Sequence, residues 1–216
     1  MSLRTLEPPA GTLAHLRKRL AVLAAGEGFH LRGITGAGAL RLAAPHPVFN
    51  LAVERIGTRN YADYAVLTGW RFFLADDADA IGMVEAEAGT RFERPRFARV
   101  SAGRMVACAV RALHTAEQTP RVQAGDYVLG MLRVPTAHMH ALWLRDGSGR
   151  ARHDLFIPLE PAPSVIEAGR LMGPVDFGRA LSAARASMEH EGRSREMRGR
   201  SLQPSPPAPS TSRTSP

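Results

Sequence analysis

The hydrophobic period of the chain alternates between that of a strand and that of a helix, and this alternation limits the folds that the chain can adopt. Residues 64–74 show the strand period most clearly, because large side chains occupy every second position on one face: Tyr64, Val66, Thr68, Trp70, Phe72 and Leu74. Shorter runs at 48–56 and 81–87 predict further strands. From Ser101 the period becomes helical, and one stripe carries Met105, Cys108, Ala109, Ala112 and Leu113. Strands and helices in separate runs are typical of an α+β domain.

A second group of strands and a second helix follow. We expect strands at 127–134, 137–145 and 153–159, the last two joined by a hairpin turn. Because Pro135 does not suit a tight hairpin turn, one bent strand over 127–145 is the alternative to the first two strands. The final helix should begin near Pro174, because proline suits the first helical position.

Two pairs of positions suggest that the halves of the chain are related. Trp70 and Trp143 lie in comparable predicted strands, and a Gly-Arg pair lies in each following helix, at 103–104 and 178–179. This spacing is consistent with a duplicated unit of a strand meander and a helix, or with two tryptophan-containing strands by coincidence. In either case we predict an α+β fold, an antiparallel β-sheet of about five or six strands with helices packed mainly on one face. Both tryptophans should lie in the core.

Length and composition predict one domain followed by a tail. A chain of 216 residues, 44% hydrophobic and 22% charged, can bury one sizeable core. We expect residues 1–191 to form a single α+β domain, with an N-terminal helix at 10–26, a Gly-rich connector at 27–46 and the sheet and remaining helices at 47–191. Residues 192–216 are rich in Arg, Ser and Pro and have no apolar period, which predicts a disordered tail.

The net charge of +8 does not by itself indicate a nucleic-acid-binding protein. Of the 28 basic residues only Lys18 is a lysine, and the many Arg, Ala, Gly and Pro residues are typical of a GC-rich, bacterial genome. The arginines before the tail are scattered, without the basic stripe or motif of a DNA or RNA binder. We therefore do not expect a nucleic-acid partner.

The sequence also favours a cytoplasmic location. We find no apolar run of the roughly 20 residues that a transmembrane helix needs, and no export signal. Cys108 is the only cysteine, which is compatible with a reducing compartment.

Three histidines form the strongest candidate for a metal site. His138 and His140 are two positions apart on a predicted strand and would project to the same face. If the hairpin turns at residues 147–148, His140 faces Leu155, and His153 becomes a diagonal neighbour on the same face. Three histidines with an open position can hold catalytic zinc, which would make the chain a small metal-dependent, hydrolase-like enzyme. The alternative is three half-exposed strand histidines with no metal or other cofactor.

Cys108 is the only candidate for a thiol nucleophile. His114 could act as its base, but the two residues are six positions apart on one predicted helix and point in different directions. We therefore interpret Cys108 as a small apolar side chain in the helix core.

The predicted sheet has no plainly polar face, and this favours an interaction protein. A sheet with helices on one side should expose polar residues on the other. That second face instead carries His138, His140, Leu142, Leu144, Leu67 and Phe73. We expect it to bind a protein partner or a second copy of the chain, most simply as a homodimer. The sequence thus predicts a non-catalytic binding or assembly protein, with the zinc enzyme as the alternative.

Overall fold

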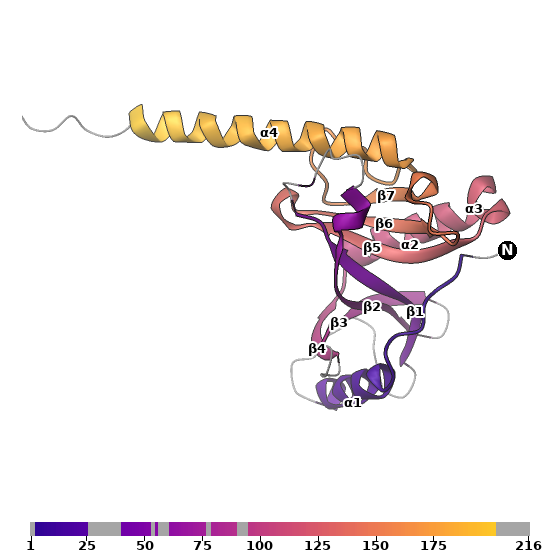
Figure 1. Cartoon of the computed structure of the whole chain (residues 1–216). Coiled ribbons are helices and arrows are strands. Elements are labelled where there is room, and N and C mark those ends of the chain that lie inside the picture. Colours follow the sequence, from indigo (N-terminus) through magenta and orange to yellow (C-terminus); the bar gives the residue numbers. More distant parts are fainter. Residues whose placement is uncertain are drawn as a thin grey trace, which may run out of the picture.

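A computed structural model describes residues 3–25, 40–52, 55, 61–76, 79–89 and 95–201. These residues build one twisted sheet flanked by helices, so the α+β prediction is confirmed (Figure 1). No helix in the described part of the chain has the length and apolar character needed to cross a membrane.

The sheet has seven strands in the order β4-β3-β2-β1-β5-β6-β7. In chain order the strands are β1 Leu40–Asn50, β2 Val66–Asp76, β3 Asp79–Glu87, β4 Arg96–Ser101, β5 Tyr127–Val134, β6 Met139–Asp146 and β7 Leu155–Leu159. All neighbouring strands are antiparallel except β1 and β5, which are parallel. The prediction of five or six antiparallel strands was therefore wrong, because the chain crosses over after β4 and places β5 beside β1.

The strand β1 was the hardest element to predict, because most of it lies in the expected connector at 27–46. Pro45 and Pro47 interrupt its sequence, and a proline cannot donate a hydrogen bond to a sheet. Pro45 lies at an irregularity in the pairing with β2 between Ala43 and His46, whereas Pro47 stays in register opposite Trp70. Pairing with β5 starts only at Val48, after both prolines. The part of the connector that precedes Leu40 lies outside the described residues.

Four α-helices pack on both faces of the sheet. They are α1 Thr12–Ala25, α2 Arg104–Gln118, α3 Pro120–Ala124 and α4 Pro174–Ser201. The described residues also include the short 3₁₀ helices η2 Tyr61–Tyr64, η3 Pro135–Ala137 and η4 Ala151–His153. Helix α1 buries Leu16 and Leu20 against Trp70, whereas α4 buries Phe177 and Leu181 in the cluster that contains Trp143. Figure 1 shows α1 and α4 at opposite ends of the twisted sheet.

Helix α2 packs on the opposite face, which we call the α2 face. Its Val106, Ala109 and Ala112 form a core, the α2 core, with sheet residues that include Phe73, Met83, Met131, Leu142 and Leu144. Because Phe73 and its β2 neighbours Phe72 and Leu74 point to opposite sides, they belong to different clusters. The expectation that the helices pack mainly on one face of the sheet was therefore wrong.

The two tryptophans are buried as predicted, with Trp70 7% and Trp143 4% exposed. Trp143 stacks on Phe156, and Phe156 stacks on Phe177 of α4 with 4.2 Å between ring centroids. The Nε1 of Trp143 donates a hydrogen bond to Asp154, 2.8 Å away. The aromatic stack packs the start of α4 against the sheet, and the hydrogen bond fixes the Trp143 ring within that stack.

The chain contains a strand meander and a helix twice, as β2-β3-β4-α2 and β5-β6-β7-α4. The positions that suggested a duplication are nevertheless not equivalent. Trp70 lies in the first strand of its meander and Trp143 in the second, and the two helices pack on opposite faces. The Gly-Arg pair at 103–104 stands at the start of α2, whereas the pair at 178–179 lies inside α4.

The boundary predicted at Gly192 lies within α4. The backbone of this helix continues to Ser201, and Figure 1 shows it extending well past the sheet. The rest of the predicted tail, 202–216, lies outside the described residues.

Candidate functional site

Polar and charged side chains occupy a part of the α2 face. Strands β1 to β4 contribute one row of cross-strand partners: His46, Arg71, Glu85 and Arg99. Arg133 of β5 lies beside Asn50 of β1 and opposite His140 of β6. All of these strands except β4 also send an apolar side chain, two positions away, to the α2 core. We call Arg71, Glu85, Arg99 and Arg133 the arginine cluster.

Three arginines of the cluster converge on one oxygen atom. The Oε2 of Glu85 accepts hydrogen bonds from Nη2 of Arg71 at 3.0 Å, from Nη2 of Arg99 at 3.3 Å and from Nη2 of Arg133. Burial would raise the pKa of Glu85, but the charges and hydrogen bonds of Arg71 and Arg133 outweigh it and lower that pKa to about 2. Glu85 is therefore ionised at neutral pH, and the cluster holds three positive charges and one negative charge.

The arginines differ in their access to solvent. The side chain of Arg71 is only 1% exposed, that of Arg133 is 15% exposed and that of Arg99 is half exposed. Buried ions are normally paired, because removing a charge from water costs several kcal/mol. One carboxylate beside two largely buried arginines and a third that is half exposed leaves this site with an excess of positive charge.

Two histidines flank the cluster and do not balance its charge. Burial, together with the charge of Arg71, lowers the pKa of His46 to about 4. Burial and the charges of Arg71 and Arg133 likewise lower the pKa of His140 to about 4. Nδ1 of the neutral His46 donates to the carbonyl oxygen of Ala44 at 2.7 Å. At neutral pH both rings are therefore uncharged hydrogen-bonding groups.

Buried nitrogen atoms without a hydrogen-bond partner gather at this one place. Among the described residues four buried side-chain atoms lack such a partner: His46 Nε2, Arg71 Nη1, Arg133 Nε and His140 Nδ1. All four belong to the cluster or to its flanking histidines. Because most buried polar groups in proteins are hydrogen-bonded, this concentration indicates a site built for more than packing.

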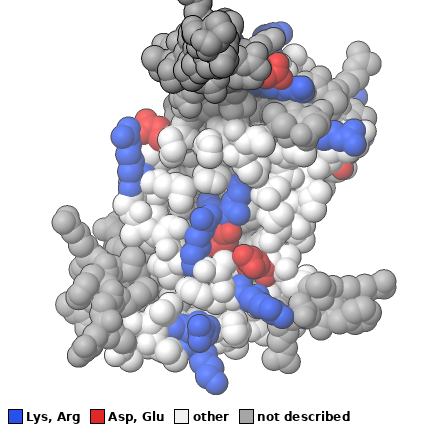
Figure 2. Space-filling view, turned by 90° about the vertical axis from the view of Figure 1, so that its left-hand side faces the viewer, with Lys and Arg blue, Asp and Glu red and all other residues white. Residues whose placement is uncertain are grey.

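A pocket of about 460 Å³ opens onto the cluster. Its lining residues come from β1, β2, β3 and β5 and from the chain that follows β3: Asn50, Leu67, Thr68, Glu85, Glu87, Ala88, Gly89 and Arg133. Oγ1 of Thr68 donates to the carbonyl oxygen of Val48 at 3.2 Å, which fixes one wall. Figure 2 shows one face of the molecule on which basic and acidic side chains lie close together near the centre, surrounded by uncharged ones.

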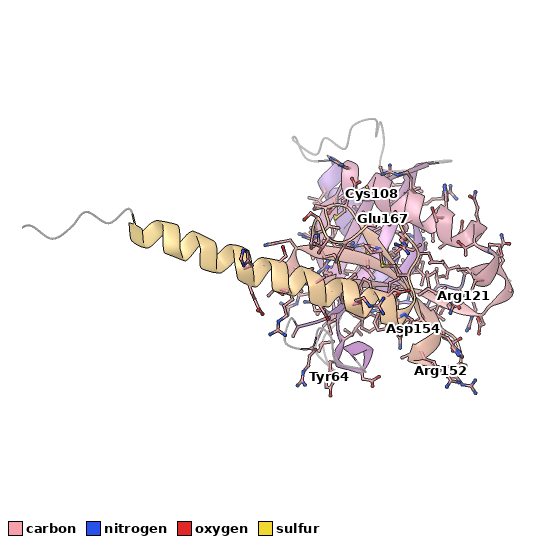
Figure 3. All side chains as sticks on the ribbon, turned by 90° about the horizontal axis from the view of Figure 1, so that it is seen from above. Tyr64, Cys108, Arg121, Arg152, Asp154 and Glu167 are labelled. Atoms are coloured by element: carbon pink, nitrogen blue, oxygen red, sulfur yellow. The ribbon has the colours of Figure 1, made fainter. Side chains whose placement is uncertain are left out.

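Cys108 lies in a separate, smaller pocket of about 280 Å³ between α2 and the chain after β7. Its Sγ accepts a hydrogen bond from Nη2 of Arg111 at 3.1 Å and lies 3.8 Å from Oε2 of Glu160. His114 is exposed and does not line this pocket. Seen from above, Cys108 and Glu167 lie on one side of α4, whereas Tyr64 and Arg152 lie on the other (Figure 3). Cys108 is thus buried as predicted, but its thiol contacts charged side chains at a pocket and is not part of an apolar cluster of the described residues.

The structure separates the residues of the predicted contact surface. Leu142, Leu144 and Phe73 are buried beneath α2, because they belong to the α2 core, and none of them is available to a partner. Leu67 is 45% exposed and lines the 460 Å³ pocket, and His140 flanks the cluster. His138 stands outside the strand, exposed at the end of η3 with φ of 47°.

The predicted zinc ligands do not come together. His140 faces Leu159 rather than Leu155, because η4 occupies 151–153 and shifts β7 along the chain. His153 therefore lies away from His140, with its Nδ1 3.5 Å from Oδ2 of Asp146. Within the described residues no group of three or more His, Cys, Asp or Glu side chains could hold a metal ion.

Sequence reasoning missed the arginine cluster, although each strand carries a signal. Arg71 stands between Trp70 and Phe72 in an otherwise apolar strand, and Glu85 lies in the middle of β3. A charged residue at an inward-facing position of a central strand requires a partner. Which residue supplies it depends on strand order.

Comparison of this chain with protein-family models, with curated proteins and with solved structures gives no match.

Proposed function

We propose that this protein is a non-catalytic binding protein for a small molecule with an oxyanion group, a carboxylate or a phosphate, which enters the 460 Å³ pocket and binds at the arginine cluster. The excess of positive charge around Glu85 is the observation that carries the proposal. Three guanidinium groups share one carboxylate oxygen, and the buried Arg71 Nη1 and Arg133 Nε have no partner.

An oxyanion would neutralise part of this positive charge, and its oxygen atoms match the geometry of a guanidinium group. A guanidinium presents its N–H groups as a planar fork that matches the two oxygens of a carboxylate or phosphate. Arg133 is the arginine that lines the pocket, so its guanidinium is the first that an entering anion meets. Asn50 and Thr68 add uncharged hydrogen-bonding groups to the same lining. The volume lies in the range of known small-molecule pockets.

Partner binding and self-association stay predictions. Of the apolar residues expected to mediate them, Leu142, Leu144 and Phe73 are covered, which leaves Leu67 as the exposed one. The cytoplasmic location likewise stays a prediction, supported by the single cysteine.

Calorimetric titration of the full chain with inorganic phosphate and with acetate, at constant ionic strength maintained with chloride, tests the proposal. We expect saturable binding, with an accompanying rise in melting temperature. Arg133→Gln should lower the affinity about tenfold or more, because charge-assisted hydrogen bonds are lost.

The matched control is Arg121→Gln, which removes an exposed arginine of α3 that does not line the pocket. This variant should bind like the parent chain. Absence of saturable binding of both anions, or equal loss in the two variants, would show that the cluster is not an anion site.

A further inference from the structure

The pocket that opens onto the arginine cluster also contains a carboxylate that the cluster does not use. Glu87 is two positions after Glu85 on β3, so the two side chains lie on the same face of the strand, and both line the pocket. Glu85 is bonded to three arginines, whereas Glu87 is exposed and forms no hydrogen bond or ion pair with any described residue.

The lining thus presents opposite charges on different strands. Arg133 projects from β5, and Glu87 projects from β3. A ligand with negative charge alone would gain from Arg133 but would be repelled by Glu87. A ligand with positive charge alone would be attracted by Glu87 but repelled by Arg133 and by the net positive charge of the cluster. Only a molecule with both charges is attracted by Arg133 and by Glu87 at the same time. Such a combination of attraction and repulsion is a common basis of specificity.

We infer that the ligand of this pocket is a small zwitterion, such as a free α-amino acid, whose carboxylate binds at Arg133 and whose ammonium group binds at Glu87. This inference rests on the proposed anion-binding function and adds the second charge to it. Leu67 and Ala88 complete the lining and offer apolar contact to a short aliphatic side chain.

Three matched probes of similar size separate the two charges. L-Alanine carries both groups, propionate lacks the ammonium group, and ethylammonium lacks the carboxylate. In calorimetric titrations of the full chain, alanine should bind about tenfold or more tightly than propionate, since one charge-assisted pair distinguishes them. Ethylammonium should show no saturable binding.

The variant Glu87→Gln removes only the acidic wall and, at an exposed position, should leave the melting temperature unchanged. Its affinity for alanine should fall about tenfold, whereas its affinity for propionate should be equal or higher. Glu117→Gln, at an exposed position of α2 outside the pocket, is the matched control and should not change either affinity.

Equal affinities for alanine and propionate, unchanged in Glu87→Gln, would refute the zwitterion inference and leave anion binding intact. Lack of saturable binding of alanine, propionate and phosphate alike would overturn both ideas. Binding of ethylammonium as tight as that of alanine would show that Glu87, and not the arginine cluster, determines what binds.

Discussion

The α2 core and the arginine cluster lie on the same face of the sheet, but the side chains of the first are apolar and those of the second are charged. Phe73 and Arg71 are two positions apart on β2, and Leu142 and His140 are two positions apart on β6. Phe73 and Leu142 pack beneath α2, whereas Arg71 and His140 join a group of charged and polar residues. One face of the sheet is therefore apolar beneath α2 and charged beside it.

The difference lies in what burial does to the free energy of folding. Each fully buried leucine or phenylalanine stabilises the fold by roughly 1.5–3 kcal/mol. A buried arginine does not, because desolvation of its charge offsets or exceeds the attraction of its partner. The α2 core thus raises the free energy of unfolding, whereas the buried charges of the cluster lower it. Binding of an anionic ligand, as we propose, would be a physical reason to retain an excess of buried positive charge.

The largest effect that we predict follows from removal of the single negative charge in the cluster. Glu85→Gln leaves three arginines without a carboxylate, one of them almost completely buried, and should lower the free energy of unfolding by about 3–5 kcal/mol. Urea denaturation of the parent and the variant measures this difference.

The exposed ion pair between Arg4 and Asp126 is the matched control for that experiment. Its two side chains are 53% and 43% exposed, and Arg4 Nε lies 2.6 Å from Oδ1 of Asp126. Asp126→Asn should cost at most about 1 kcal/mol, because solvent screens exposed pairs. Equal losses in Glu85→Gln and Asp126→Asn would remove the distinction between a buried cluster and an ordinary surface pair.

A somewhat smaller effect is expected in the apolar part of the same face. Leu142→Ala creates a cavity beneath α2 and should cost roughly 3 kcal/mol, since Leu142 is fully buried. Leu142→Met, which nearly preserves the volume, should cost less than about 1.5 kcal/mol. If Leu142→Ala instead leaves stability unchanged and abolishes self-association, Leu142 belongs to an open surface as the sequence had suggested, and α2 does not cover it.

The smallest effect concerns the histidines beside the cluster. Burial lowers the pKa of His46 from 6.5 to about 4, so the unfolded chain takes up a proton between these values that the folded chain does not. Stability should therefore fall as the pH falls through this window, by roughly 2 kcal/mol from pH 7 to pH 5 for His46. The lowered pKa of His140 acts in the same direction.

Urea denaturation at the two pH values, on the parent chain and on His46→Gln, isolates this contribution. The variant should lose less stability between pH 7 and pH 5 than the parent does. The same pH dependence in both would mean that His46 is not buried beside Arg71. Below about pH 4 the lowered pKa of Glu85 adds a further loss of stability, because its carboxylate must then be protonated.

The sequence by itself determined the local elements of this protein. The alternation at 64–74 corresponds to β2, the helix expected at 10–26 to α1 and Pro174 to the first residue of α4. It also placed Trp70 and Trp143 in the core. Period, capping and side-chain size are properties of neighbouring residues, so they can be read before the chain is folded.

Only the tertiary structure decided which strands are neighbours and which face each helix covers. The crossover after β4 sets β5 parallel to β1, and this pairing brings Arg133 beside the row that contains Arg71 and Glu85. The predicted face with Leu142 and Leu144 looked open because nothing in the local pattern indicates that α2 lies over it. The candidate site is assembled from residues 46 to 140 by strand order and register, and both depend on long-range pairing that no short window of sequence contains.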